Sequence, residues 1–75
     1  MTVAQILLRQ NAAPFFSYRL FLVDGRELLI QHPDFLSVAK KEELVTVFDL
    51  TGGAEIVDLT LVVSIRYEAA AATTR

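Results

Sequence analysis

Cysteine is absent from this chain of 75 residues, and histidine occurs only once. Without cysteine, the chain has no disulfide to reinforce a small core and no thiolate to bind zinc or an iron–sulfur cluster. A single histidine also restricts catalysis, because a serine nucleophile needs a base within hydrogen-bonding distance. A fold of this length therefore depends on its own apolar core.

Clustered positive charge is also lacking. The chain has seven Lys and Arg residues against nine Asp and Glu residues, which gives a net charge of −2. Non-specific binding to DNA or RNA requires a cationic face that neutralises phosphates. The basic residues are scattered, and the one adjacent pair, Lys40-Lys41, is followed directly by Glu42-Glu43. This pattern argues against a nucleic acid as a partner.

Long hydrophobic runs are missing as well. The N-terminal run Ile6–Leu8 is shorter than the roughly 7–15 residues of a signal-peptide core. The most apolar stretch, Leu59–Ile65, is interrupted by Thr60 and Ser64 and is far shorter than the about 20 residues of a membrane-spanning helix. We therefore expect a cytoplasmic protein with no membrane association.

Apolar residues are nevertheless abundant, at 53% of the chain. The usual share is about 45–50%. A single domain of this length buries only about 60% of the surface that its unfolded chain exposes. The chain therefore has more apolar side chains than one monomer can bury, which predicts a homo-oligomer or a contact with another protein.

The N-terminal residues predict a short helix. Thr2 and Gln5 have the spacing of a capping box, in which each side chain hydrogen-bonds the backbone of the other residue. Apolar residues follow at helical spacing: Val3, Ile6 and Leu7. Asn11 is expected to end the helix in the left-handed region, and Pro14 prevents its continuation. The prediction is a helix over residues 3–10.

From Phe16 the apolar residues alternate with period two, which indicates strands. Asp24-Gly25 between two such runs predicts a β-hairpin with a type I′ turn, in which both residues have positive φ. Further strands are expected in these segments: 36–39, 44–50, 54–59 and 62–68.

The predicted fold is mainly β. A short N-terminal helix precedes a four- to five-stranded, strongly bent antiparallel sheet or a small SH3-like or Sm-like barrel. Residues 1–68 form one domain in this interpretation, and residues 69–75 form a flexible tail.

Several blocks resemble a set of short bacterial proteins known only as hypothetical proteins of unknown function. The blocks are Pro14-Phe15, Asp24-Gly25-Arg26, His32-Pro33-Asp34-Phe35 and Ile56-Val57-Asp58-Leu59 with Ile65. The resemblance spans residues 14–68, and His-Pro-Asp-Phe is its most specific part. It implies a shared fold, and no activity or functional residue comes with it.

Few residues offer chemistry. His32 and Asp34 supply at most two metal ligands, whereas three or four are usual. We therefore predict a protein that is not an enzyme and has no catalytic residue, metal site or cofactor. His32 is expected to end a strand and to bond Asp34 or a backbone carbonyl. Candidate ligand-binding residues are His32, Asp34, Arg26 and Arg66.

The second face of the first hairpin mixes apolar residues with single charges. Either the N-terminal helix or a partner chain covers it, since exposed apolar patches usually mark interfaces. The candidate interface residues are Leu7, Phe21, Val23 and Tyr67. The leading hypothesis is a non-catalytic domain acting through self-association and protein–protein contacts. The alternatives are a small-molecule sensor or an Sm-like or SH3-like nucleic-acid binder that uses Arg19, Arg26 or Arg66.

Overall fold

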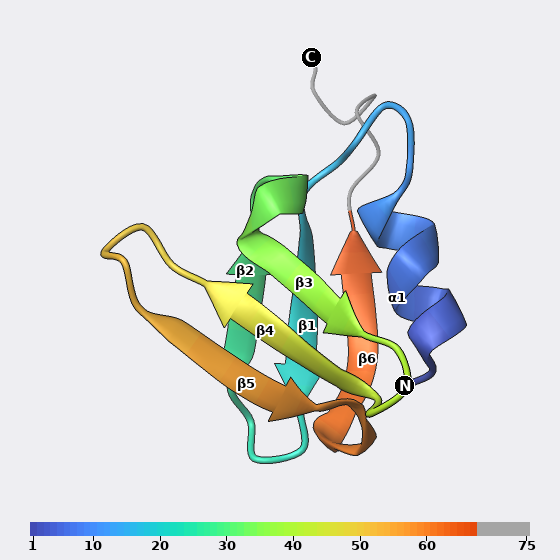
Figure 1. Cartoon of the computed structure of the whole chain (residues 1–75), viewed down its shortest axis with the longest axis vertical. Coiled ribbons are helices and arrows are strands. Elements are labelled where there is room, and N and C mark those ends of the chain that lie inside the picture. Colours follow the sequence, from blue (N-terminus) through green and yellow to red (C-terminus); the bar gives the residue numbers. More distant parts are fainter. Residues whose placement is uncertain (68–75) are drawn as a thin grey trace.

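The structure, a computed structural model, describes residues 1–67, and the predicted tail at 69–75 lies outside them. This part of the chain forms one α-helix, six β-strands and two short 3₁₀-helices (Figure 1). In chain order they are α1 (Val3–Gln10), β1 (Tyr18–Leu22), β2 (Glu27–Ile30), η1 (Pro33–Phe35), β3 (Leu36–Ala39), β4 (Leu44–Phe48), β5 (Ala54–Asp58), η2 (Leu59–Leu61) and β6 (Val62–Tyr67).

The strands form two antiparallel sheets of three strands each, with the orders β2-β1-β6 and β3-β4-β5. Figure 1 shows the second sheet in front of the first. The mainly β fold with one short N-terminal helix is confirmed. The finer prediction of one bent sheet or a barrel is not confirmed, because within residues 1–67 neither sheet closes on itself. The chain crosses between the sheets at η1 and η2.

The core lies between the two sheets. Tyr18, Leu20 and Leu22 alternate inward from β1, as the period-two pattern predicted. The other buried apolar residues are Ile6, Ile30, Leu36, Val45, Val47, Val57, Leu59 and Val62. Each large apolar side chain that leaves water in this way stabilises the fold by about 1.5–3 kcal/mol.

Helix α1 begins and ends at the predicted residues, and its capping box is present. The Thr2 hydroxyl accepts from the Gln5 backbone amide at 3.2 Å, and the Gln5 side chain accepts from the Thr2 amide at 3.1 Å. The predicted left-handed end is wrong, because Asn11 has a φ of −102°. The Asn11 backbone amide still donates to the Leu7 carbonyl, so the helix ends without a residue in the left-handed region.

Helix α1 lies beside β6 and buries Ile6 in the core (Figure 1). The outer face of the β2-β1-β6 sheet is not covered by it, because Val23 and Val63 remain 65% and 60% exposed. Of the two predicted ways to cover that face, the helix is therefore excluded. No helix among residues 1–67 has the length and apolar character needed to cross a bilayer.

The first hairpin is present, but its predicted type I′ turn is wrong. Only Gly25 has a positive φ, at 93°, whereas Asp24 does not. The Leu22 amide donates to the Arg26 carbonyl at 2.9 Å, which leaves a three-residue loop. Such loops place one residue in the left-handed region beside the strand, and glycine adopts that conformation without strain.

Candidate functional site

His32 and Asp34 form a local turn in which both side chains remain largely exposed. The His32 Nδ1 atom accepts from the Asp34 backbone amide at 3.2 Å and lies 3.6 Å from Asp34 Oδ2. Through this contact His32 caps the N-terminus of η1, the 3₁₀-helix that follows β2 in the chain. His32 thus makes the predicted local bond with Asp34, although β2 already ends at Ile30. No group of three or more potential metal ligands occurs among residues 1–67.

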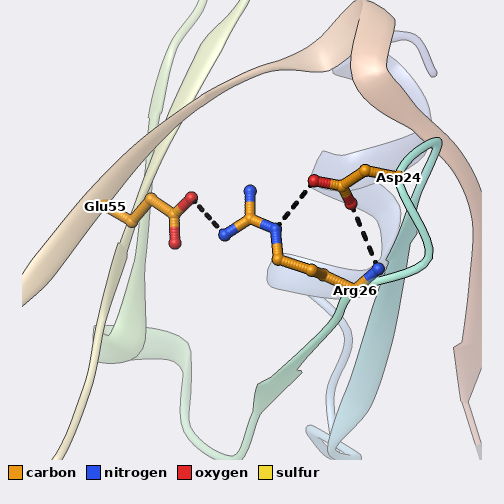
Figure 2. Close-up of polar contacts among 3 residues, drawn as sticks. All are labelled: Asp24, Arg26 and Glu55. Atoms are coloured by element: carbon orange, nitrogen blue, oxygen red, sulfur yellow. Dashed lines mark hydrogen bonds and ion pairs between the residues drawn. The ribbon is translucent and has the colours of Figure 1, made fainter.

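Arg26 is held between two carboxylates (Figure 2). Its Nη1 lies 2.7 Å from Glu55 Oε2, and its Nε lies 3.0 Å from Asp24 Oδ2. These bonds, first to Glu55 and then to Asp24, raise the pKa of Arg26. The backbone amide of Arg26, followed by its side chain, lowers the pKa of Asp24. Arg26 thus links the β1–β2 hairpin to β5, and its Nε and Nη1 atoms already have carboxylate partners inside the chain.

Arg66 lies beside Arg19 on the outer face of the β2-β1-β6 sheet. The two residues are directly opposite each other in the β1–β6 pairing, and Leu29 is opposite Arg19 on the other side. A hollow of about 260 Å³ opens over them, and its lining residues are Ser17, Tyr18, Arg19, Leu29, Gln31 and Arg66. Arg66 was predicted as a candidate from the sequence, whereas Ser17 and Gln31 were not, because the register of distant strands is not readable from one sequence.

The four predicted interface residues do not form one surface. Val23 follows β1 at the hairpin end of the sheet, whereas Tyr67 pairs with Tyr18 at the opposite end. Arg9 covers one side of the Tyr67 ring, with its guanidinium carbon 3.9 Å from the ring centroid. Leu7 and Phe21 are each partly buried. Of the four, Val23 is the most available to a partner.

The second sheet carries an apolar surface that was not predicted from the sequence. We call it the Ile56 face. It consists of the residues that alternate with the core residues along β3, β4 and β5. These residues are Ser37, Ala39, Leu44, Thr46, Phe48, Ala54, Ile56 and Asp58. Ile56 is 68% exposed and Phe48 is 39% exposed, while Leu50 in the adjoining turn is 79% exposed. Only Asp58 is charged. The adjacent apolar pairs Val47-Phe48 and Ile56-Val57 signalled this surface, because such pairs place one apolar residue on each side of a strand.

Asp49 and Asp58 each bind their own turn and do not share a proton. Asp49 Oδ1 accepts from the Thr51 hydroxyl at 2.6 Å and from the Gly53 amide at 2.9 Å, and these bonds lower the pKa of Asp49. Asp58 accepts from the amide and hydroxyl of Thr60, which lowers its pKa as well. Their role is to fix turns.

In comparisons with known proteins, no protein family, no curated protein and no solved structure matches this chain.

Proposed function

We propose that this chain is a non-catalytic β domain that acts by self-association, in which strand β5 of one copy pairs with β5 of a second copy along the border of the Ile56 face. The observation that carries the proposal is the exposure of Ile56 on a sheet face with a single charge. Apolar patches of this kind usually mark an interface.

Strand β5 supports the proposal because it lies at an edge of its sheet. It is hydrogen-bonded to β4 on one side, and none of the described strands pairs with its other side. An open edge presents backbone donors and acceptors that a second strand can use. Two copies of β5 in antiparallel register would join the two three-stranded sheets into one sheet of about six strands, within the usual range.

The charges on β5 are compatible with this pairing. A two-fold axis at Ile56 places Glu55 opposite Val57 and Ala54 opposite Asp58, so that no two acids face each other. Glu55 is also neutralised by Arg26 within its own chain. Like charges directly opposite each other would destabilise the pair, whereas apolar pairs stabilise it. In this register the two Ile56 side chains meet at the centre of the interface.

The nucleic-acid alternative, with its Sm-like or SH3-like fold, has weaker support. Arg26 is engaged by Asp24 and Glu55, and Arg19 is 3.7 Å from Glu27. Arg19 and Arg66 alone do not form the extended cationic face that a chain of phosphates needs. An oligonucleotide titration at low and high salt tests this alternative, and salt-sensitive binding would favour it.

A pair of matched variants tests the location of the interface. Ile56→Lys places a charge on the Ile56 face, and Val23→Lys places one on the outer face of the other sheet; the two residues are 68% and 65% exposed. We expect light scattering during gel filtration to show a monomer for Ile56→Lys and a dimer for Val23→Lys. A dimer for Ile56→Lys and a monomer for Val23→Lys would instead locate the interface at Val23, one of the interface residues predicted from the sequence.

A further inference from the structure

A second surface of the protein has the chemistry of a small-anion site. It is the hollow over Arg19 and Arg66, on the sheet opposite the one that carries the Ile56 face. We propose that this hollow binds a small, doubly charged oxyanion, such as a phosphate monoester or a dicarboxylate. This inference goes beyond self-association and does not depend on it.

The arrangement of the two arginines supports the proposal. Arg19 and Arg66 are cross-strand partners, and directly opposite residues have Cβ atoms about 4.5–5.5 Å apart. Two arginine side chains that start at this spacing can reach one anion together, and the anion offsets the repulsion between their like charges. Each guanidinium carries planar N–H donors that match the oxygens of a carboxylate or a phosphate. A doubly charged ligand would neutralise both side chains.

The rest of the lining adds polar contacts and one apolar wall. Ser17 and Gln31 lie beyond the ends of β1 and β2 and contribute a hydroxyl and an amide that can donate to an oxyanion. Leu29, which is 42% exposed, forms the apolar side of the hollow. Tyr18 contributes backbone only, because its side chain is buried in the core.

Glu27 is the carboxylate that competes with a ligand. Its Oε1 lies 3.7 Å from the Nε of Arg19, and both side chains are about half exposed. This contact is long for a charge-assisted hydrogen bond and involves Nε, so the terminal nitrogens of Arg19 are left for a ligand. Within residues 1–67, no carboxylate lies within 4.0 Å of Arg66.

The volume limits the size of the ligand. At about 260 Å³, the hollow is slightly smaller than the roughly 300 Å³ at which pockets for drug-sized molecules begin. It therefore suits an anionic group with a short carbon chain.

Titration followed by amide NMR shifts tests the proposal, with inorganic phosphate and succinate as probes and sodium chloride at matched ionic strength as the reference. We expect saturable shifts at Ser17, Arg19, Gln31 and Arg66, with a dissociation constant of about 1 mM or below for at least one probe. Phosphate binding alone would identify a phosphate monoester as the ligand class, and succinate binding alone a dicarboxylate.

Substitutions of exposed residues then test which side chains form the anion site. Arg19→Gln and Arg66→Gln should each weaken binding about tenfold, which is the effect of losing one charge-assisted contact. Glu27→Gln should strengthen binding about threefold, since it removes the competing carboxylate. Arg26→Gln, away from the hollow, should leave the affinity unchanged. Non-saturable shifts that chloride reproduces, or equal losses with Arg26→Gln, would overturn the proposal.

Discussion

The Tyr18 hydroxyl donates a hydrogen bond to Gln10 Oε1 at 2.8 Å, and this bond ties the end of α1 to the core strand β1. The amide group of the same Gln10 donates to the backbone carbonyls of Pro33 and Leu36, the latter at 2.8 Å. One side chain therefore connects the helix, the first sheet and the turn that leads into the second sheet. Tyr18 is almost completely buried, so its hydroxyl depends on this partner.

Replacement of Gln10 should be costly for a single polar side chain. Gln10→Ala leaves the buried Tyr18 hydroxyl without its partner and removes one donor from the carbonyls of Pro33 and Leu36, and we expect a loss of about 1–3 kcal/mol in the free energy of unfolding. Urea denaturation followed by circular dichroism measures the change. Gln5→Ala, in the same helix, serves as the control and should cost less than about 1 kcal/mol, because it affects only the capping box. Equal losses in both variants would contradict the role given to Gln10.

Alkaline pH should destabilise the protein through Tyr18. Burial raises the pKa of Tyr18 to about 12, from 10.0 for an exposed tyrosine. The unfolded chain therefore releases this proton first, and the stability conferred by neutral Tyr18 falls as pH rises from about 10 to about 12. Unfolding free energies measured at intervals across this range test the prediction. The slope should be smaller in Tyr18→Phe, and an equal slope would contradict it.

Acid should weaken the β4–β5 turn through Asp49. Hydrogen bonds from the Thr51 hydroxyl and from the amides of Gly53 and Thr51 hold the pKa of Asp49 below its ordinary value. The unfolded chain takes up this proton first as the pH falls, so the stabilisation is complete above about pH 4 and is lost below it. Denaturation series from neutral to acidic pH should show a smaller decline for Asp49→Asn than for wild type. Glu42→Gln, on an exposed turn, should decline as wild type does.

The link between Arg26 and Glu55 should contribute little to stability. Both side chains are close to half exposed, at 50% and 43%. Exposed ion pairs contribute about 0.2–1 kcal/mol, and salt screens them. A double-mutant cycle with Arg26→Gln and Glu55→Gln should therefore give a coupling in that range that decreases at high salt. A larger, salt-independent coupling would show that the pair is effectively buried.

The local elements were predictable because their signals are local. The capping box joins Thr2 and Gln5, which are only three residues apart, and the helix begins directly after Thr2 as this pattern predicts. The alternation of Tyr18, Leu20 and Leu22 likewise identifies the face of β1 that enters the core. In both cases a few neighbouring residues determine the backbone conformation and the buried side.

The arrangement of the sheets was not predictable in the same way. Whether strands form one bent sheet or two sheets depends on where the chain crosses, and here η1 and η2 make the crossings. The hairpin loop also departs from expectation, because Asp24 accepts from the Arg26 amide instead of adopting a positive φ. The pairing of Arg19 with Arg66 depends on a register between strands at the two ends of the chain, which no single segment encodes.

Sedimentation equilibrium of the wild-type protein at about 100 μM tests the central claim most directly, because a weak dimer would be populated at that concentration. The account predicts a mass approaching twice the 8.4 kDa of one chain, and a return to 8.4 kDa for Ile56→Lys under the same conditions. A wild-type mass of 8.4 kDa throughout the concentration range would contradict self-association through β5.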